Sequence, residues 1–425
     1  MRSRLHWRRA ATAAGIYASV VLGMVATVVA ARVLGLEEFG HFATAFACVT
    51  FLQVLLDLTV EDVLVKQGFH YVAAGEWGRL RRLFRLALQA KLAGGVVASL
   101  LLLVFAPFAD AVFGVEGIGV AVAAAALIPL AQAPANVATS VFLLRGRYDV
   151  RGAYQVVHMG TRLVAVVVAA PFGAWETLAA IALAQALATG AISVPGVRFL
   201  RAFPPAPDCV LGEDARPVLR FAALSSVGSV MVSLRTSLAP LILGLMVGPT
   251  NVGLFRIAQA PYSGVVAASA PVRLIFLTEQ TRDWERGDAE RVLRGIRRFV
   301  LAASGLGIAL VGAGWFAMEW LVETVFGSEY AGATRAAQIV LVAAAIHLVF
   351  AWTKSFATTA GRPSATIIAH GVEAVVLLSL TIVLAHRYGI EGAAAAVVAS
   401  AVAYAGTWLI LFRRIERQTL TGLRA

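Results

Sequence analysis

The sequence predicts an all-α, polytopic membrane protein of about twelve transmembrane helices, arranged as two similar six-helix bundles. Three observations predict it. Of the 425 residues, 60% are hydrophobic and only 14% are charged, whereas soluble domains are about 25% charged. Apolar runs long enough to cross a bilayer recur along the chain. Two motifs recur at one fixed spacing, which indicates an internal duplication.

The apolar runs define the predicted spans. A soluble fold of this size could not hide so much apolar surface, because much of any folded surface faces water. A membrane β-barrel would show short segments of strict alternation, and these runs do not alternate. The first run follows several arginines but is too long for a signal peptide, so we expect a retained helix. The predicted spans are 10–32, 40–60, 86–107, 118–143, 152–171, 177–197, 219–247, 252–275, 299–322, 335–359, 364–386 and 391–411.

Basic residues predict the orientation. Of the 36 lysines and arginines, 30 lie towards one side of the predicted membrane and only three towards the other. Cytoplasmic loops carry this excess, so both termini are expected in the cytoplasm. The net charge of +12 suits anionic lipid headgroups, because the basic residues fill short gaps between apolar runs. Membrane lipids are therefore expected partners, and nucleic acid is not.

The internal repeat divides the chain. Gly35–Ala45 and Gly248–Ala258 share the pattern G-x4-G-x-F-x2-A, displaced by 213 positions, and Val112–Glu116 recurs as Val325–Glu329 at the same displacement. Each half carries an even number of spans, so the repeats are expected to be parallel. A proline-rich segment joins them. The predicted domains are an N-terminal bundle (1–200), a cytoplasmic linker (201–217) and a C-terminal bundle (218–425).

Four motifs carry a resemblance to a known family: Ala31–Gly40, Leu245–Phe255, Phe326–Tyr330 and Tyr388–Ala394. With them the chain resembles the polysaccharide-exporter (Wzx-type) branch of the multidrug/oligosaccharidyl-lipid/polysaccharide (MOP) flippase superfamily. The resemblance implies a MATE-like pair of bundles around a central cavity. It also implies a multi-pass protein of the bacterial inner membrane that moves a polyprenyl-diphosphate-linked oligosaccharide to the outer leaflet by alternating access. Other polysaccharide assembly proteins are then candidate partners.

One departure from the family concerns coupling. Related proteins often carry an acidic residue late in span seven, where this chain has Thr236 and Ser237. The coupling ion therefore stays open. Five side chains within or near the spans are candidate coupling or proton-carrying groups, with a purely structural role as the alternative for each. They are His158, His347, His370, Glu373 and Asp57.

Four cations in the spans are the candidate substrate-binding residues. A charge at the bilayer centre costs about 2.5–3.5 kcal/mol on insertion scales, so it normally faces a partner or a wet cavity. Arg162, Arg235, Arg256 and Lys354 would suit a diphosphate headgroup, which arginine binds in a bidentate manner. The alternative is that these cations pair with carboxylates or carbonyls and lock helices together.

Polar side chains also follow two predicted helices. One stripe lies along span two, and another lies along span four, where two prolines are expected to kink the helix. The stripes are Thr50, Gln53, Asp57 and Glu61, and Gln132, Asn136 and Ser140, with the prolines at 129 and 134.

Other functions fit the sequence less well. It contains no phosphate-binding G-x4-G-K-[ST] loop, no metal-ligand spacing and no G-x-S-x-G elbow. We therefore predict that the protein is not an enzyme and has no catalytic residues, metal or cofactor. A drug/cation antiporter of the same fold is the first alternative, although cations outnumber carboxylates in the spans. A membrane enzyme of polysaccharide assembly is the second, although every outer loop is short.

Overall fold

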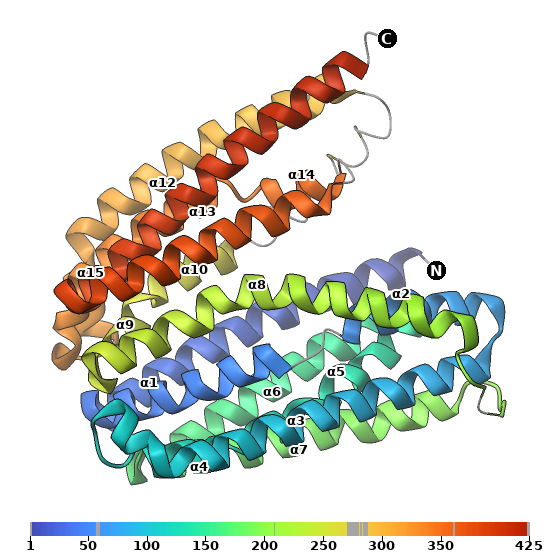
Figure 1. Ribbon diagram of the computed structural model, residues 1–425, viewed down its shortest axis with the longest axis horizontal. Helices are drawn as coiled ribbons and strands as arrows, with labels where there is room; N and C mark the ends of the chain where they lie inside the picture. The colour runs from blue at the N-terminus through green and yellow to red at the C-terminus, as the bar shows by residue number, and fades with distance from the viewer. Residues whose placement is uncertain are drawn as a thin grey trace. The chain divides into compact units, whose positions relative to one another are not determined.

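A computed structural model describes residues 2–56, 60–207, 209–269, 280, 283, 288–359 and 362–422. Within these ranges the chain is almost entirely helical and contains no strand (Figure 1). Eight helical segments of the described chain are long and apolar enough to cross a membrane. The predicted all-α membrane fold is confirmed.

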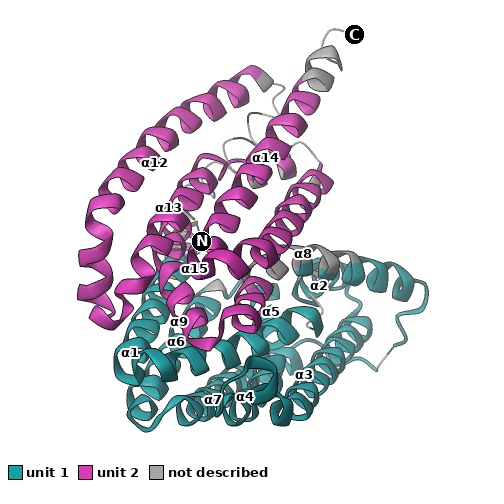
Figure 2. Cartoon of the chain, turned by 60° about the vertical axis from the view of Figure 1, so that its left-hand side comes forward, with its two compact units in different colours: residues 1–230 teal, residues 231–425 magenta. Residues whose placement is uncertain are grey.

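The chain divides into two compact units, Met1–Val230 (unit 1) and Met231–Ala425 (unit 2) (Figure 2). The division lies within helix α8 (Ala215–Val247), which is later in the chain than the predicted linker. The predicted domain bounds of 1–200, 201–217 and 218–425 stay a prediction.

Unit 1 is built around three helix pairings. Helix α1 packs along α6, while α5 packs against both α3 and α7. The predicted kink near Pro129 is confirmed, because α4 ends before this proline and α5 begins beside it; Pro134 lies inside α5. Its elements are α1 (Arg2–Leu56), α2 (Val60–Ala74), α3 (Trp77–Phe113), α4 (Ile118–Ala125), α5 (Ile128–Leu144), α6 (Tyr148–Ala169), η1 (Ala170–Phe172), α7 (Ala174–Arg201), η2 (Gly212–Asp214) and the first part of α8.

Unit 2 centres on α13, which packs against α10, α12 and α15. The predicted span 335–359 is interrupted after Val349, where α13 ends, and three residues separate it from the start of α14. The predicted span 252–275 continues beyond the described residues. The elements are the second part of α8, α9 (Pro249–Ala258), α10 (Ala260–Ala268), α12 (Ala289–Val325), η3 (Ser328–Ala333), α13 (Thr334–Val349), α14 (Thr353–Thr359) and α15 (Pro363–Gly422).

Glycines mark the ends of repeat-related spans. Gly35 bends α1 with φ 73° and ψ 173°, and Gly248, 213 residues later, precedes α9 with φ 87° and ψ 165°. A residue with a Cβ atom is strained in this conformation. The duplication seen in the sequence therefore extends to the backbone. Gly389 bends α15 in a similar way (φ 56°), so α1 and α15 each supply two spans, in agreement with the predicted twelve-helix pattern.

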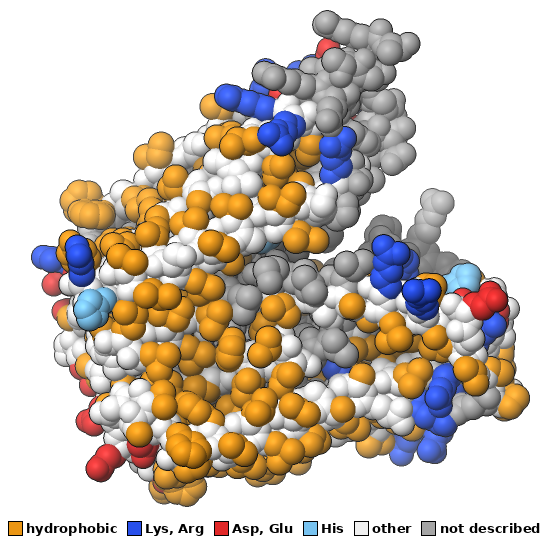
Figure 3. Space-filling model, in the orientation of Figure 1, with side chains coloured by type: hydrophobic (Ala, Val, Ile, Leu, Met, Phe, Trp, Pro, Cys, Tyr) orange, Lys and Arg blue, Asp and Glu red, His pale blue; other side chains and the backbone are white. Residues whose placement is uncertain are grey.

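The surface of both units suits lipid. Large apolar side chains cover the helices (Figure 3), including Val104 of α3 (65% exposed), Leu183 of α7 (63%) and Phe316 of α12 (88%). Because no water-soluble protein leaves so many large side chains exposed along its helices, these faces are the lipid-contacting ones.

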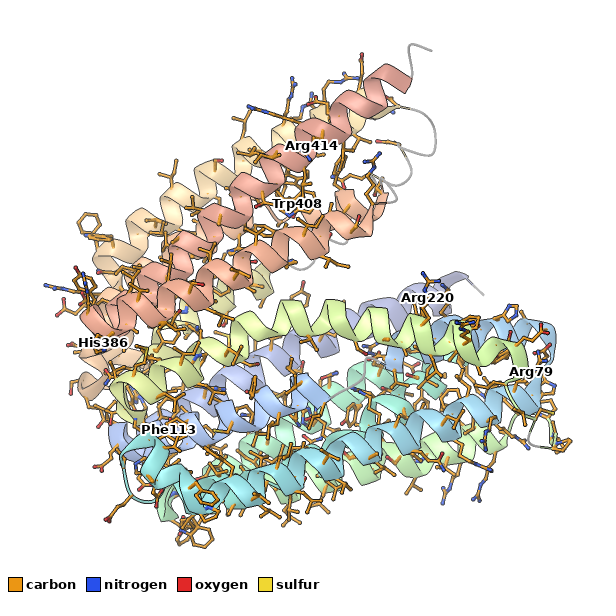
Figure 4. All side chains as sticks on the ribbon, viewed as in Figure 1. Arg79, Phe113, Arg220, His386, Trp408 and Arg414 are labelled. Carbon is orange, nitrogen blue, oxygen red and sulfur yellow. The ribbon has the colours of Figure 1, made fainter. Side chains whose placement is uncertain are left out.

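Charged residues of unit 1 separate towards its two ends. Lys and Arg side chains gather where α3 begins (Figure 3), and Figure 4 shows Arg79 and Arg220 at this end and Phe113 at the opposite end. At the far end, Glu38 accepts the N–H of Ala174 at 2.8 Å, which ties the bend of α1 to the start of α7. We call the two ends of unit 1 the basic end and the acidic end.

The predicted linker is docked against unit 1 at the basic end. Arg81 of α3 donates to the carbonyl oxygens of Phe203 and Pro204 at 3.0 and 3.1 Å. The guanidinium carbon of Arg145 lies 4.1 Å from the centre of the Phe203 ring. The start of the segment 201–217 is therefore held by α3 and by the end of α5.

Candidate functional site

Unit 1 contains a polar cavity of about 220 Å³ between α1, α3 and α5. Its polar lining comes from Thr50 and Gln53 of α1, Lys91 of α3, and Gln132 and Asn136 of α5. Gln53 Nε2 donates to Gln132 Oε1 at 3.0 Å. The structure therefore brings together Thr50 and Gln53 of one predicted polar stripe with Gln132 and Asn136 of the other.

Small residues allow the helices to approach around this cavity. A Cβ atom on Gly94 would lie 2.7 Å from the carbonyl oxygen of Leu56, and one on Gly95 would lie 3.1 Å from Cα of Leu130. Both distances are shorter than ordinary van der Waals contact, so the glycine pair lets α3 sit against α1 and α5 at once. These glycines follow Lys91 by one turn of α3 and line the same cavity.

Lys91 is a residue that sequence reasoning missed. The sequence grouped it with the basic residues on the cytoplasmic side, but the structure buries it to 5% exposure inside α3. Burying an ammonium group is costly unless it is paired or hydrogen-bonded. The signal that could have placed it is the length of the helix. Because α3 begins at Trp77, nine residues before the predicted span, Lys91 lies well inside the helix and not near its start.

Arg162 and His158 lie on the same face of α6 but contact different residues. The guanidinium carbon of Arg162 lies 4.5 Å from the centre of the Phe46 ring in α1, a cation–π contact. His158 Nε2 is hydrogen-bonded to Gln185 Oε1 of α7, and Gln185 in turn donates to Thr189 at 3.1 Å. His158 thus belongs to a buried network that joins α6 to α7.

Unit 2 contains a buried centre of three titratable side chains. Glu373 of α15 has no exposed surface. Its Oε1 lies 2.8 Å from His347 Nε2 of α13, and its Oε2 lies 2.9 Å from His370 Nδ1. The sequence named all three as candidate coupling groups, and the structure places them in mutual contact. We call them the His–Glu–His centre.

Aromatic rings enclose the His–Glu–His centre. The Tyr404 ring lies 5.3 Å from that of His347 and 5.0 Å from that of His370, measured between ring centres. Tyr262 of α10 meets His347 edge-on at 5.6 Å. The Tyr404 hydroxyl is hydrogen-bonded to Thr353 of α14 at 2.8 Å. Four helices, α10, α13, α14 and α15, therefore converge on this centre.

Both ring nitrogens of His347 are hydrogen-bonded. Its Nδ1 lies 3.0 Å from the carbonyl oxygen of Ala343, one turn earlier in α13, and its Nε2 is bonded to Glu373 of α15. The imidazole ring therefore joins α13 to α15 at this centre.

The remaining predicted cations lie on three different helices. Arg256 lies in the last turn of α9 and is half-buried. Arg235 and Lys354 belong to α8 and α14, but their side chains lie outside the described part of the chain. Asp57 also lies outside the described residues.

Comparisons with known proteins assign the chain to a family. Residues 10–271 match the model of a family described as polysaccharide biosynthesis protein. No curated protein matches the sequence. Solved structures share the fold at low sequence identity. An inward-facing multidrug resistance MATE family transporter of the MOP superfamily has a TM-score of 0.73 and 16% identity, covering 94% of this chain and 95% of its own.

Two further solved structures share this fold. The lipid II flippase MurJ, in an inward closed conformation, has a TM-score of 0.69 and 10% identity over 96% of this chain and 90% of its own. A Vibrio cholerae MATE transporter has a TM-score of 0.63 and 14% identity over 98% and 97%. These likenesses show the fold, and the family match covers more than half of the sequence. The chain is a member of the polysaccharide biosynthesis protein family with the fold of MATE and MurJ membrane transporters.

Proposed function

We propose that the protein is a flippase that moves a polyprenyl-diphosphate-linked oligosaccharide from the cytoplasmic to the outer leaflet of the bacterial inner membrane by alternating access. Family membership supports a role in polysaccharide assembly, and the fold supports transport. The observation that carries the substrate proposal is the polar cavity of unit 1, whose buried cation is Lys91.

The chemistry of this cavity favours an anion. Among the described residues that line it, the one charged side chain is a lysine, and the others include two glutamines, an asparagine and a threonine. An ammonium group and side-chain N–H groups are hydrogen-bond donors, and diphosphate oxygens are strong acceptors. A lipid-linked diphosphate would therefore bind with its charge against Lys91. A cationic drug would meet this positive charge and be repelled.

The cations named from the sequence extend the proposal. Arg162 lies in the same unit on α6, and Arg256, Arg235 and Lys354 lie on helices α9, α8 and α14 of unit 2. We assign to them the guidance of the anionic headgroup along its path. Outward movement of an anion from a negative cytoplasm gains about 2.3 kcal/mol per charge per 100 mV. A diphosphate can thus be driven by the membrane potential without ATP.

The His–Glu–His centre is proposed as the coupling site. Its carboxylate is fully buried and hydrogen-bonded to both histidines. The titratable groups that face the centre are Tyr404 from α15 and Tyr262 from α10. Gain or loss of a proton here would change the charge between α13 and α15, so each protonation state would favour its own packing of these helices.

The proposal is tested by transport in vesicles that contain the purified protein. Lipid-linked oligosaccharide is supplied in one leaflet, and its arrival in the other is measured with an impermeant glycan-cleaving enzyme. Lys91→Gln and Arg162→Gln are expected to slow arrival at least tenfold. Lys66→Gln is the control, because Lys66 is an exposed cation of α2 stacked on Phe221 at 4.3 Å and lies outside the cavity.

Two outcomes would overturn the proposal. Normal glycan arrival with Lys91→Gln would show that the cavity cation does not bind the substrate. Transport of cationic dyes by wild-type vesicles, with no movement of the lipid-linked glycan, would identify a drug/cation antiporter instead.

A further inference from the structure

Unit 1 has a second hollow, separate from the polar cavity. It is a groove of about 530 Å³ between α3, α5 and α7, within the usual size range of small-ligand sites, about 300–1,000 Å³. Most of its wall is apolar. The wall includes Phe84, Leu88, Val137, Val141, Val197 and Leu200.

Arginines stand at one end of this groove. Arg81 and Arg85 lie one turn apart near the start of α3, and Arg201 is the last residue of α7. From Arg81 the α3 wall continues to Leu88, about 10 Å along the helix axis. No acidic side chain occurs among the described residues of the lining. The groove therefore presents positive charge at the basic end and an apolar channel that leads away from it.

The floor of the groove is formed by close helix packing. A Cβ atom on Gly196 of α7 would lie 3.1 Å from Cβ of Ala138 in α5, so small residues bring these helices together there. The rim stays open, because Val197 is 46% exposed. A lipid-facing helix surface surrounds the opening, so a chain from the bilayer can enter sideways.

We propose that this groove binds one anionic phospholipid, with its phosphate against Arg85 and Arg201 and an acyl chain along the apolar wall. Both arginine side chains are exposed, which leaves them accessible to a headgroup. Charge complementarity favours this occupant, because two oxygens of a phosphate group accept two parallel N–H bonds from one guanidinium group. A zwitterionic lipid would bring a second, positive group to the same arginines and bind less well.

Arg81 connects the groove to the linker. It lines the groove and also donates to the carbonyl oxygens of Phe203 and Pro204. A bound lipid that fills the wall beside Arg81 restricts this side chain and the linker that it holds. The anionic lipid is thus a structural ligand of the basic end of unit 1, and its binding is expected to raise the thermal stability of the full chain.

Binding is measured by native mass spectrometry of the purified protein, with phosphatidylglycerol as the anionic probe and phosphatidylcholine as the neutral control. The expected result is one tightly held phosphatidylglycerol and a higher unfolding temperature. Each basic residue near anionic lipid contributes about 1 kcal/mol. The double variant Arg85→Gln/Arg201→Gln is expected to bind about 30-fold more weakly, since about 2 kcal/mol corresponds to that factor.

The matched control is Arg82→Gln/Arg198→Gln, which removes the same charge from the same two helices at positions that do not line the groove. It is expected to keep wild-type binding. Equal loss in both double variants, or equal binding of phosphatidylcholine, would overturn the proposal. Retention of polyprenyl phosphate in place of phosphatidylglycerol would also overturn it, because the groove would then hold the transported carrier. The unfolding temperature of each lipid-free variant shows whether it has folded.

Discussion

His347 Nε2 lies 2.8 Å from Oε1 of Glu373, a carboxylate with no exposed surface. The two residues belong to different helices, α13 and α15, and the second imidazole nitrogen of His347 is taken up by the carbonyl oxygen of Ala343. A hydrogen bond to a fully buried carboxylate therefore joins the two helices, and the packing of α13 against α15 depends on this pair.

Glu373→Gln should destabilise the protein by about 3–5 kcal/mol, because removing one partner of a buried pair leaves the other uncompensated. Unfolding in mixed detergent, followed by circular dichroism, measures the change. Glu391→Gln is the control on the same helix. Glu391 faces Arg335 at 4.0 Å with both side chains exposed, and such a pair contributes about 0–1 kcal/mol. Equal losses in the two variants would refute a special role for Glu373.

Glycan transport is expected to depend on His347, because its imidazole is hydrogen-bonded to the fully buried carboxylate of Glu373. In the vesicle assay, with a proton gradient imposed, His347→Gln should lose the transport that the gradient adds. His158→Gln should keep it, because His158 is bonded to Gln185 in a separate network of unit 1. A wild-type response to the gradient in His347→Gln would exclude the His–Glu–His centre as the coupling site.

Gly15→Ala should destabilise unit 1 by about 1–3 kcal/mol through overpacking. A Cβ atom at Gly15 of α1 would lie 2.7 Å from the backbone oxygen of Gly152 in α6, and neither backbone can move aside easily. Gly160→Ala, in α6, meets nothing within 4 Å and should be neutral or slightly stabilising. Thermal unfolding of both variants tests this pairing, and equal unfolding temperatures would argue against the close approach of α1 and α6.

The environment of Tyr71 in α2 predicts that the protein loses stability at alkaline pH. Burial, together with the carboxylate of Asp214 that accepts its hydroxyl at 3.1 Å, raises the pKa of Tyr71 to about 12. The unfolded tyrosine ionises near pH 10, about two units lower. Its contribution to stability is therefore complete below pH 10 and is lost as the pH rises towards 12, because only the unfolded state then gains from ionisation.

Tyr71→Phe should remove this part of the alkaline loss while lowering stability at neutral pH by about 1.5–3 kcal/mol, the usual value of a hydrogen bond to a charged group. Unfolding temperatures measured from pH 8 to 12 give both the loss of stability near neutral pH and the size of the alkaline loss. Tyr388→Phe, at a tyrosine that is 64% exposed, should follow the wild-type curve. If Tyr71→Phe follows it as well, Tyr71 does not control the transition.

The sequence predicted those features that the bilayer imposes directly. Apolar runs located the helices because lipid requires them, and the repeat located the glycines at 35 and 248. His370 and Glu373 were named from the sequence as separate candidates on one helix, and their spacing of three residues allows the contact that the structure shows. Their contact with His347 could not be predicted, because it depends on how α13 is rotated against α15. Lys91 was missed for a similar reason, since its depth depends on where α3 begins.

The separation of charge in unit 1 has an electrical consequence. Lys and Arg side chains gather at the basic end, and acidic side chains gather at the opposite end (Figure 3). With the basic end facing a negative cytoplasm, as the distribution of basic residues predicts, unit 1 would carry a dipole along the membrane normal. Turning it over would move these charges against the field at about 2.3 kcal/mol per charge per 100 mV, so the membrane potential would favour this orientation of the bundle.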